Sequence, residues 1–337
     1  MTPTVIATAT TNASSAFHHT AACSHGRRAG AGDHRRQRVG QRARPRTGDP
    51  LPEIGHTDIL PGCAAGPCDQ PALMHHNGRM LGVIGGSGFY IFFGSDADDV
   101  TVDTPYGPPS APVTVGAVGG HRVAFLPRHG ARHEFSAHTV PYRANLWALR
   151  KLGVRRVLAP CAVGSLVPEL GPGAVVVPDQ LVDRTRGRAD TYFDSGAVHV
   201  DFADPYCPAL REAVTGLPGV VDGGTMVVIQ GPRFSTRAES RWFASAGFSL
   251  VNMTGYPEAV LARELEMCYA AIALVTDLDA GVSAGEGVKA VEVFAEFEKN
   301  IEPFKKLVRD AIGRVAAERS CTQCSPHAGV SLPIELP

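Results

Sequence analysis

The chain has 337 residues, of which 44% are hydrophobic and 19% are charged, and its formal net charge is −1. A chain of this size can bury a large core, and its near-neutral charge gives no electrostatic reason to expect a nucleic acid or a membrane surface as a partner. No apolar run is long enough to span a bilayer. Eight cysteines scattered over a long chain are typical of reduced thiols rather than of a disulfide framework. We therefore predict a cytoplasmic protein.

Residues 1–73 differ in composition from the rest of the chain. They contain an arginine-rich run, no lysine and no apolar periodicity that could bury one face of an element. Such a run could be a nucleic-acid-binding arm or a transit peptide. We favour a disordered or non-native extension, with Met74 or Met80 as the natural start. The predicted domain then occupies residues 80–318, and a C-terminal tail follows at 319–337.

From Met80 onward, strand-like apolar runs alternate with helical patterns. The last helical pattern is the clearest, because apolar residues recur every three or four positions from Val288 to Val315. Alternating strands and helices predict an α/β fold with a parallel or mixed central sheet, whose ligands bind at the carboxyl ends of strands. The predicted strands are 81–85, 112–117, 121–126, 155–161, 173–178, 224–230, 249–253 and 270–276, and the predicted helices are 141–152, 208–216, 236–247, 257–269 and 288–318.

The first predicted strand runs into a glycine-rich turn, IGGSG. Its glycines allow close approach of a ligand, Ser87 offers a hydroxyl, and the backbone N–H groups of such a turn suit an anion. No lysine follows, so the turn is not a P-loop, and Phe89 stands where a nucleophile elbow would need glycine. By itself the turn is equally compatible with a purely structural role.

Two further predicted strands end in polar or reactive side chains. Arg128 and His129 directly follow one of them, and the planar guanidinium of arginine suits phosphate or carboxylate. Cys161 and Ala162 lie at the end of the other. The sequence places no base beside Cys161, so it favours a buried structural thiol over a nucleophile.

Three later strand ends add an aromatic ring, a thioether, hydroxyls and carboxylates. The residues are Phe234 and Ser235, Met253 and Thr254, and Asp277 and Asp279. An apolar strand that finishes in two carboxylates needs a ligand or partner to receive them. Together, the six strand ends match an anion, an aromatic ring and a hydrogen-bonding heterocycle.

Long ordered motifs between about Leu81 and about Ala317 resemble those of the S-methyl-5′-thioadenosine phosphorylases, within the trimeric purine nucleoside phosphorylases. They are GVIGGSG, DTPYGPPS, RHG, YRANLWAL, GTMVVIQGPRFSTRAES, VNMTGYPEAVLARE and TDLD. The resemblance implies the nucleoside phosphorylase fold, a mixed and partly barrelled sheet flanked by helices. It also implies a homotrimer with active sites near subunit boundaries, inorganic phosphate as a co-substrate, and no metal or organic cofactor.

The resemblance also implies roles for individual residues. Phosphate contacts are expected from Ser87, Arg128, His129, Cys161, Ala162 and Thr254. Nucleoside contacts are expected from Phe234, Met253, Asp277, Leu278 and Asp279, with Ser235 and Ala290 at positions that separate substrates. Some family members carry hydroxyl residues where this chain has Pro160 and Cys161, so side-chain donors to phosphate are fewer here.

The implied reaction is the phosphorolysis of a purine nucleoside, in which phosphate attacks the anomeric carbon and the base leaves protonated. Burial and a like-charged neighbour raise the pKa of a carboxyl group, so Asp277 can serve as the general acid at N7. An adenine edge offers a 6-amino donor to such carboxylates, whereas a 6-oxopurine would turn an acceptor toward them. With the apolar residues Val282, Val288, Ala290 and Val293 expected near the 5′ end, the preferred substrate is S-methyl-5′-thioadenosine.

Three other functions remain open at this point. The chain could be a 6-oxopurine nucleoside phosphorylase acting on inosine or guanosine, a hydrolytic nucleosidase, or a nucleotide-binding module without catalysis. Arg128 and the glycine-rich turn argue against the nucleosidase, because they would have no anion to bind.

A zinc site is a separate possibility at the C-terminus. Cys321, Cys324 and His327 have plausible ligand spacing. Only one C-x-x-C is present, however, and a fourth ligand would have to come from elsewhere, such as Cys63 or Cys68. We therefore expect no bound metal.

Overall fold

Two long neighbouring strands, β5 (Arg156–Ser165) and β11 (Cys268–Leu278), lie at the centre of the computed structural model. The structure describes residues 80–89, 92–94, 96–282, 287–316, 318, 321–327 and 329–337. The predicted extension at 1–73, with Cys63 and Cys68, lies outside the described residues. The described residues belong to one unit, Asp69–Pro337.

All eight predicted strands and all five predicted helices are present. The other strands are β1 (Leu81–Gly85), β2 (Asp98–Val100), β3 (Val113–Val118), β4 (His121–Pro127), β6 (Val175–Val177), β7 (Gln180–Arg184), β8 (Val220–Asp222), β9 (Thr225–Ile229) and β10 (Leu250–Asn252). The helices are α1 (Tyr142–Lys151), α2 (Pro208–Thr215), α3 (Arg237–Ser245), α4 (Gly255–Glu264) and α5 (Ala290–Arg314).

The differences from the predicted elements have local causes. The strands β2, β7 and β8 were not predicted, because their residues are partly exposed and form no continuous apolar run. The helix predicted at 257–269 ends at Glu264 instead, since Glu266 adopts a positive φ of 55° and Cys268 already begins β11. A left-handed residue ends a helix because it turns the chain away from the helical path.

The sheet is mixed and branches at β5. Its main path runs β2-β3-β4-β1-β5-β10-β9-β7, while β11 also pairs with β5 and continues through β6 to β8. The strands β1 and β11 run parallel to β5, whereas β10 runs antiparallel to it. Because β5 has three partners, the sheet curves around it instead of forming one flat layer. The predicted α/β class, with a mixed sheet flanked by helices, is confirmed.

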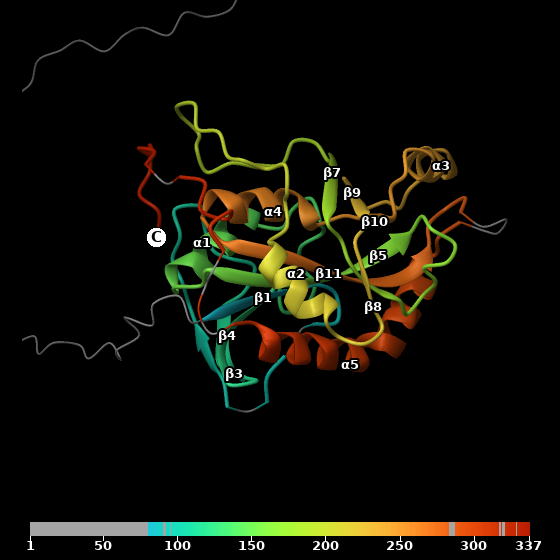
Figure 1. Ribbon diagram of the computed structural model, residues 1–337, viewed down its shortest axis with the longest axis horizontal. Helices are drawn as coiled ribbons and strands as arrows, with labels where there is room; N and C mark the ends of the chain where they lie inside the picture. Colours follow the sequence, from blue (N-terminus) through green and yellow to red (C-terminus); the bar gives the residue numbers. More distant parts are fainter. Residues whose placement is uncertain are drawn as a thin grey trace, which may run out of the picture. The chain divides into compact units, whose positions relative to one another are not determined.

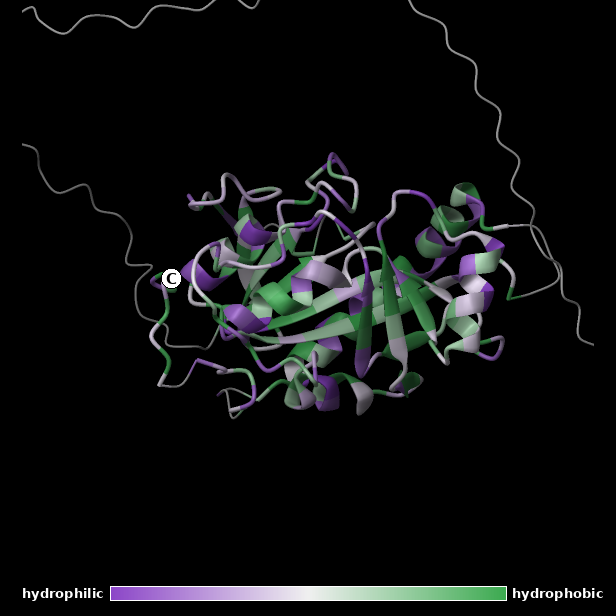
Figure 2. Cartoon of the chain, turned by 90° about the horizontal axis from the view of Figure 1, so that it is seen from above, coloured by the Kyte–Doolittle hydropathy of each residue, from purple (hydrophilic) through white to green (hydrophobic). Residues whose placement is uncertain are grey.

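Both faces of the central sheet are buried. Along β11 alternate residues enter two different cores, with Tyr269 and Ala271 on the side covered by α1 and α4, and Ala270 and Ile272 on the side covered by α2 and α5 (Figure 1). Side chains alternate between the faces of a strand, so a strand covered on both sides must be apolar throughout. The central strands are accordingly largely hydrophobic in Figure 2.

The residues that follow α5 also pack on the domain. Cys324 and His327 are buried, and Ile334 and Leu336 contact the core on the α1 and α4 side. Among the helices of the described residues, none combines the length and the apolar composition needed to cross a membrane.

Candidate active site

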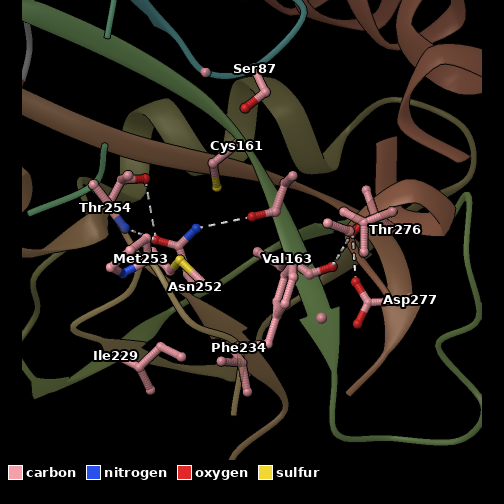
Figure 3. Close-up of a pocket in the computed structure, with 18 of the residues that line it drawn as sticks. Ser87, Cys161, Val163, Ile229, Phe234, Asn252, Met253, Thr254, Thr276 and Asp277 are labelled. Atoms are coloured by element: carbon pink, nitrogen blue, oxygen red, sulfur yellow. Dashed lines mark hydrogen bonds between the residues drawn. The ribbon is translucent and has the colours of Figure 1, made fainter. Parts of the chain in front are cut away.

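A cavity of about 350 Å³ opens where the carboxyl ends of several strands meet. Its walls include almost every residue that the sequence analysis placed in the site: Ser87, Arg128, His129, Cys161, Ala162, Phe234, Ser235, Met253, Thr254, Asp277, Asp279 and Ala290. Figure 3 shows Ser87 and Phe234 on opposite sides of Cys161. Leu278 is not among the residues that line the cavity. It lies between Asp277 and Asp279, which do line it, and successive residues of a strand point to opposite faces.

The glycine-rich turn after β1 forms one wall of the cavity. A Cβ atom on Gly86 would lie 3.1 Å from Nη1 of Arg128 and 3.2 Å from the carbonyl oxygen of Pro160. Any larger residue at this position would therefore crowd the arginine. The glycine lets the turn, with Ser87 at the cavity wall, lie directly against the guanidinium.

Arg128 is fully buried and already paired with an acid. Its Nε donates to Oε2 of Glu258 at 2.6 Å, and its Nη2 donates to Oε1 at 2.8 Å. The remaining bonds go to the carbonyl oxygens of Ile84 and Pro160. Burial alone would lower the pKa of Arg128, but Glu258 raises it above its ordinary value.

The Arg128 fork, which the sequence suggested for a phosphate or a carboxylate, holds a carboxylate of the chain itself. The bidentate edge of the guanidinium is occupied by Glu258, which itself accepts a hydrogen bond of 2.7 Å from the Tyr269 hydroxyl. A guanidinium has five N–H donors, and the bonds above use four of them. One N–H on Nη1 therefore remains for a ligand.

His129 is held as a neutral imidazole. Burial is the main cause that lowers its pKa to about 4, and the charge of Arg128 lowers it further. Its Nδ1 lies 2.8 Å from the carbonyl oxygen of Phe135, so Nδ1 carries the proton and Nε2 is left with a lone pair. The ring stacks on His133 with a centroid separation of 4.6 Å. His133 also lines the cavity, although we predicted no role for it.

Asn252 fixes the shape of the wall that carries Met253 and Thr254. Its Oδ1 accepts hydrogen bonds from the backbone N–H groups of Thr254 at 2.8 Å and Gly255 at 2.7 Å. Its Nδ2 donates to the carbonyl oxygen of Ala162 at 3.1 Å. This one side chain therefore joins the end of β10 to β5. Sequence reasoning missed it, because an asparagine at a strand end is also typical of an ordinary turn.

A bulge in β11 turns two consecutive residues toward the cavity. The pairing of β11 with β5 shifts between Val275 and Asp277, and both Thr276 and Asp277 line the cavity. In a regular strand these neighbours would face opposite sides, but an extra residue in a bulge changes that alternation. Gly164, opposite Asp277 on β5, leaves the space, since a Cβ there would lie 3.1 Å from Oδ1 of Asp277.

Asp277 has the acidity expected of a general acid. Burial is the main cause that raises its pKa to about 6, and the neighbouring Asp279 raises it further. The Thr276 hydroxyl opposes this rise, since its oxygen lies 2.8 Å from Oδ2 of Asp277. The same hydroxyl lies 3.2 Å from the carbonyl oxygen of Val163. It can thus donate to Asp277 when that group is ionised and to Val163 when it is protonated.

Asp279 is only 3% exposed and lacks a complete set of partners. Burial raises its pKa, although the hydroxyls of Ser235 and Ser240 partly offset the rise. Within the described part of the chain, Oδ2 of Asp279 and the hydroxyl oxygens of both serines make no hydrogen bond of normal geometry. Buried polar atoms normally have partners, so unsatisfied groups beside a cavity mark a place for a polar ligand.

Cys161 is not an activated nucleophile. It is buried, and burial raises the pKa of its thiol to about 12. The nearby Arg128 does lower the pKa in part, but Glu258 offsets that effect. A thiol that stays protonated at neutral pH is a poor nucleophile, in agreement with the structural role expected from the sequence.

The apolar part of the cavity is formed by the start of α5. Ala290, Val293 and Phe294 contribute to the wall. Of the four residues expected there, Val282 instead packs against the small core around Phe243, and Val288 is not among the lining residues. Phe294, which also lines the cavity, is 57% exposed in the single chain.

Comparisons with known proteins agree with this architecture. A family model described as the phosphorylase superfamily matches residues 81–313. The chain is 80% identical over 258 residues to S-methyl-5′-thioadenosine phosphorylase of Mycolicibacterium smegmatis, covering 77% of this chain and 100% of the relative. It is 53% identical over 273 residues to purine nucleoside phosphorylase of Streptomyces coelicolor, covering 76% and 97% respectively.

A solved structure has the same fold. Methylthioadenosine phosphorylase from Schistosoma mansoni in complex with adenine superimposes with a TM-score of 0.70 at 35% sequence identity, covering 74% of this chain and 96% of that chain. Sequence, fold and cavity thus lead to one conclusion: the chain is an enzyme of the phosphorylase superfamily and belongs within it to the S-methyl-5′-thioadenosine phosphorylase family.

Proposed function

We propose that the protein is a pentosyltransferase that cleaves S-methyl-5′-thioadenosine with inorganic phosphate, giving adenine and 5-methylthioribose 1-phosphate. The observation that carries this proposal is the pair of the partly buried Asp277 and the buried Asp279, which opens into the same cavity as the glycine-rich turn and Arg128. One end of the cavity suits an anion, and the other offers carboxyl groups to a purine. The names of the relatives support the choice of nucleoside.

In this proposal Asp277 donates a proton to N7 of the leaving base. Its pKa of about 6 keeps a fraction of the carboxyl groups protonated near neutral pH, and a bound purine would bury the group further and raise the pKa again. After the proton has moved to the base, the Asp277 carboxylate can accept a hydrogen bond from the Thr276 hydroxyl, whose oxygen lies 2.8 Å from Oδ2. Asp279 then accepts a hydrogen bond from the 6-amino group of adenine, or its charge helps to keep the pKa of Asp277 raised.

Phosphate is the co-substrate and nucleophile at the opposite end. The remaining Nη1 donor of Arg128, the Ser87 and Thr254 hydroxyls and the backbone beside Ala162 are its proposed contacts. The lone pair on Nε2 of His129, which stays neutral because burial and Arg128 lower its pKa to about 4, can accept a hydrogen bond from a protonated phosphate oxygen. Because phosphate itself attacks the anomeric carbon, no covalent enzyme intermediate is needed, which agrees with the protonated thiol of Cys161.

We also infer that the functional enzyme is a cytoplasmic homotrimer. Val291 and Phe294 at the start of α5 are 80% and 57% exposed, and large exposed apolar side chains beside a functional cavity are typical of protein interfaces. A second subunit over this helix would close the apolar part of the site. Light scattering after size exclusion should give a trimer mass, and Phe294→Glu should weaken assembly.

The decisive experiment measures base release from S-methyl-5′-thioadenosine, adenosine and inosine, each with and without phosphate. Release should require phosphate, and S-methyl-5′-thioadenosine should exceed inosine in kcat/KM on the order of a hundredfold. Release without phosphate would identify a nucleosidase, and no release at all would identify a binding module. Equal efficiency on inosine would favour a 6-oxopurine nucleoside phosphorylase.

A variant pair tests the role of Asp277 in the same assay. Asp277→Asn should lose most activity toward S-methyl-5′-thioadenosine but lose less, or gain, toward inosine, because an amide can donate to a 6-oxo group. Asp98→Asn is the matched control, since Asp98 is exposed on the edge strand β2. If Asp277→Asn were as active as Asp98→Asn on both substrates, Asp277 would not be the general acid.

A further inference from the structure

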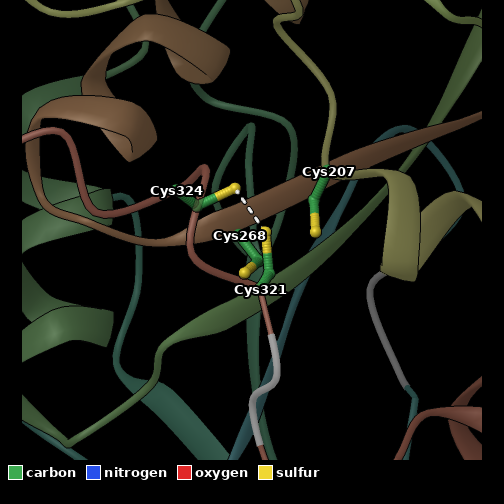
Figure 4. A group of neighbouring side chains, drawn as sticks. All are labelled: Cys207, Cys268, Cys321 and Cys324. Carbon is green, nitrogen blue, oxygen red and sulfur yellow. Dashed lines mark hydrogen bonds between the residues drawn. The ribbon is translucent and has the colours of Figure 1, made fainter.

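Four cysteines from three separate parts of the chain meet away from the active site. Cys207 is the N-cap residue of α2, Cys268 is the first residue of β11, and Cys321 and Cys324 follow α5. Their Sγ atoms all lie within 4.8 Å of one another (Figure 4). All four are thiols rather than halves of disulfides, and the phosphorolysis described above uses none of them.

The spacing of the sulfur atoms fits a metal better than a disulfide. In a tetrahedral site with Zn–S bonds of about 2.3 Å, the sulfur atoms lie roughly 3.8 Å apart. The Sγ atoms of Cys321 and Cys324 are 3.5 Å apart, well beyond a disulfide bond length of about 2.05 Å. Four sulfur atoms so close together form the donor set of a structural zinc site.

We propose that the protein binds a structural Zn²⁺ ion through Cys207, Cys268, Cys321 and Cys324. All-thiolate tetrahedral sites select zinc or iron, and zinc needs no redox chemistry. Binding would transfer the four thiol protons to solvent and leave four thiolates on the cation.

The ligand set differs from the one that the sequence spacing suggested. His327 is not part of it, because its Nε2 lies 2.9 Å from the carbonyl oxygen of Glu264 and its ring packs edge-on against Phe193. The third and fourth ligands come from Cys207 and Cys268, which stand far from the C-x-x-C in sequence. The site is therefore complete without Cys63 or Cys68.

The site is closed and distant from the reaction. Cys207, Cys268 and Cys324 are each 1% exposed, and Cys321 is partly buried. A site with four cysteine ligands leaves no open position for a substrate. Cys268 and Asp277 stand at opposite ends of β11, about 30 Å apart at the usual rise per strand residue. The metal would fasten the segment after α5 to α2 and β11, so its role is structural.

The first test uses the full chain, expressed in zinc-supplemented medium and purified without chelators. Elemental analysis should find one zinc per chain, and X-ray absorption should show a shell of four sulfurs at about 2.3 Å. A mercurial reagent should release this zinc as it titrates the thiols. Absence of metal with four reactive thiols, iron in place of zinc, or a disulfide found by mass spectrometry would each overturn the proposal.

Variants test the ligand assignment. Cys324→Ser and Cys207→Ser should each lose the zinc and melt at a lower temperature, while Cys161→Ala, a cysteine outside the cluster, should keep the metal. His327→Ala should also keep it. If both serine variants kept the zinc, or if His327→Ala lost zinc while the serine variants kept it, the ligand set would be a different one. The zinc content of the unmodified chain does not depend on these variants, so it tests the proposal even if a variant fails to fold.

Discussion

Replacing Asp277 with asparagine should make the folded protein more stable at neutral pH, although it removes the general acid. Burial raises the pKa of Asp277 in the folded chain from its ordinary value of 3.8 to about 6. Between these two values the folded state binds more protons than the unfolded state. The stability of the native enzyme therefore falls as pH rises through this window, and asparagine, which does not ionise, avoids that loss.

The size of the effect follows from the two pKa values. The gain in the free energy of unfolding of Asp277→Asn over the native chain should rise from about 1 kcal/mol at pH 4.5 to about 3 kcal/mol at pH 7.5. These are upper values, because the asparagine amide must still find partners beside Thr276. Above pH 7.5 the gain should stay constant, since Asp277 is then ionised in both states.

Urea unfolding of both proteins at several pH values measures this difference directly. Asp98→Asn serves as the control for the loss of a carboxyl group, because Asp98 is exposed on the edge strand β2. If Asp277→Asn were less stable than the native chain at pH 7.5, or if its gain did not change with pH, then burial would not be what raises the pKa of Asp277.

Three further predictions concern other parts of the structure. Arg128→Ala should lower the free energy of unfolding by about 3–5 kcal/mol, because it leaves Glu258 buried without a counter-charge; a melting temperature close to that of the native enzyme would contradict this. Gly164→Ala should lower kcat/KM by about tenfold or more with little loss of stability, since the new Cβ displaces Asp277; kinetics equal to those of the native enzyme would show that the aspartate adapts. A chain that begins at Met80 should keep full activity, because the family match begins at residue 81; its failure to fold would place the preceding residues within the domain.

Much of the site could be predicted because its residues follow directly from short local patterns. Each predicted strand end is marked by a change from apolar to polar or small residues, and the carboxyl ends of strands gather in α/β folds. Ser87, Arg128 and Asp277 therefore lie on one cavity although they are far apart in sequence. Glu258 could not be found in this way, since a glutamate inside a helix pattern is typical of an exposed face.

The sequence by itself determined the α/β class, the order of the main strands and helices, and the residues at the strand ends. It could do so because hydrophobic periodicity records which side of each element is buried. Only the tertiary structure decided that Glu258 occupies the fork of Arg128, that a bulge turns Thr276 and Asp277 toward one cavity, and that Cys207 and Cys268 join the C-terminal C-x-x-C. These features depend on contacts between residues tens to hundreds of positions apart, and no local pattern along the chain encodes which distant side chain will arrive beside a given group.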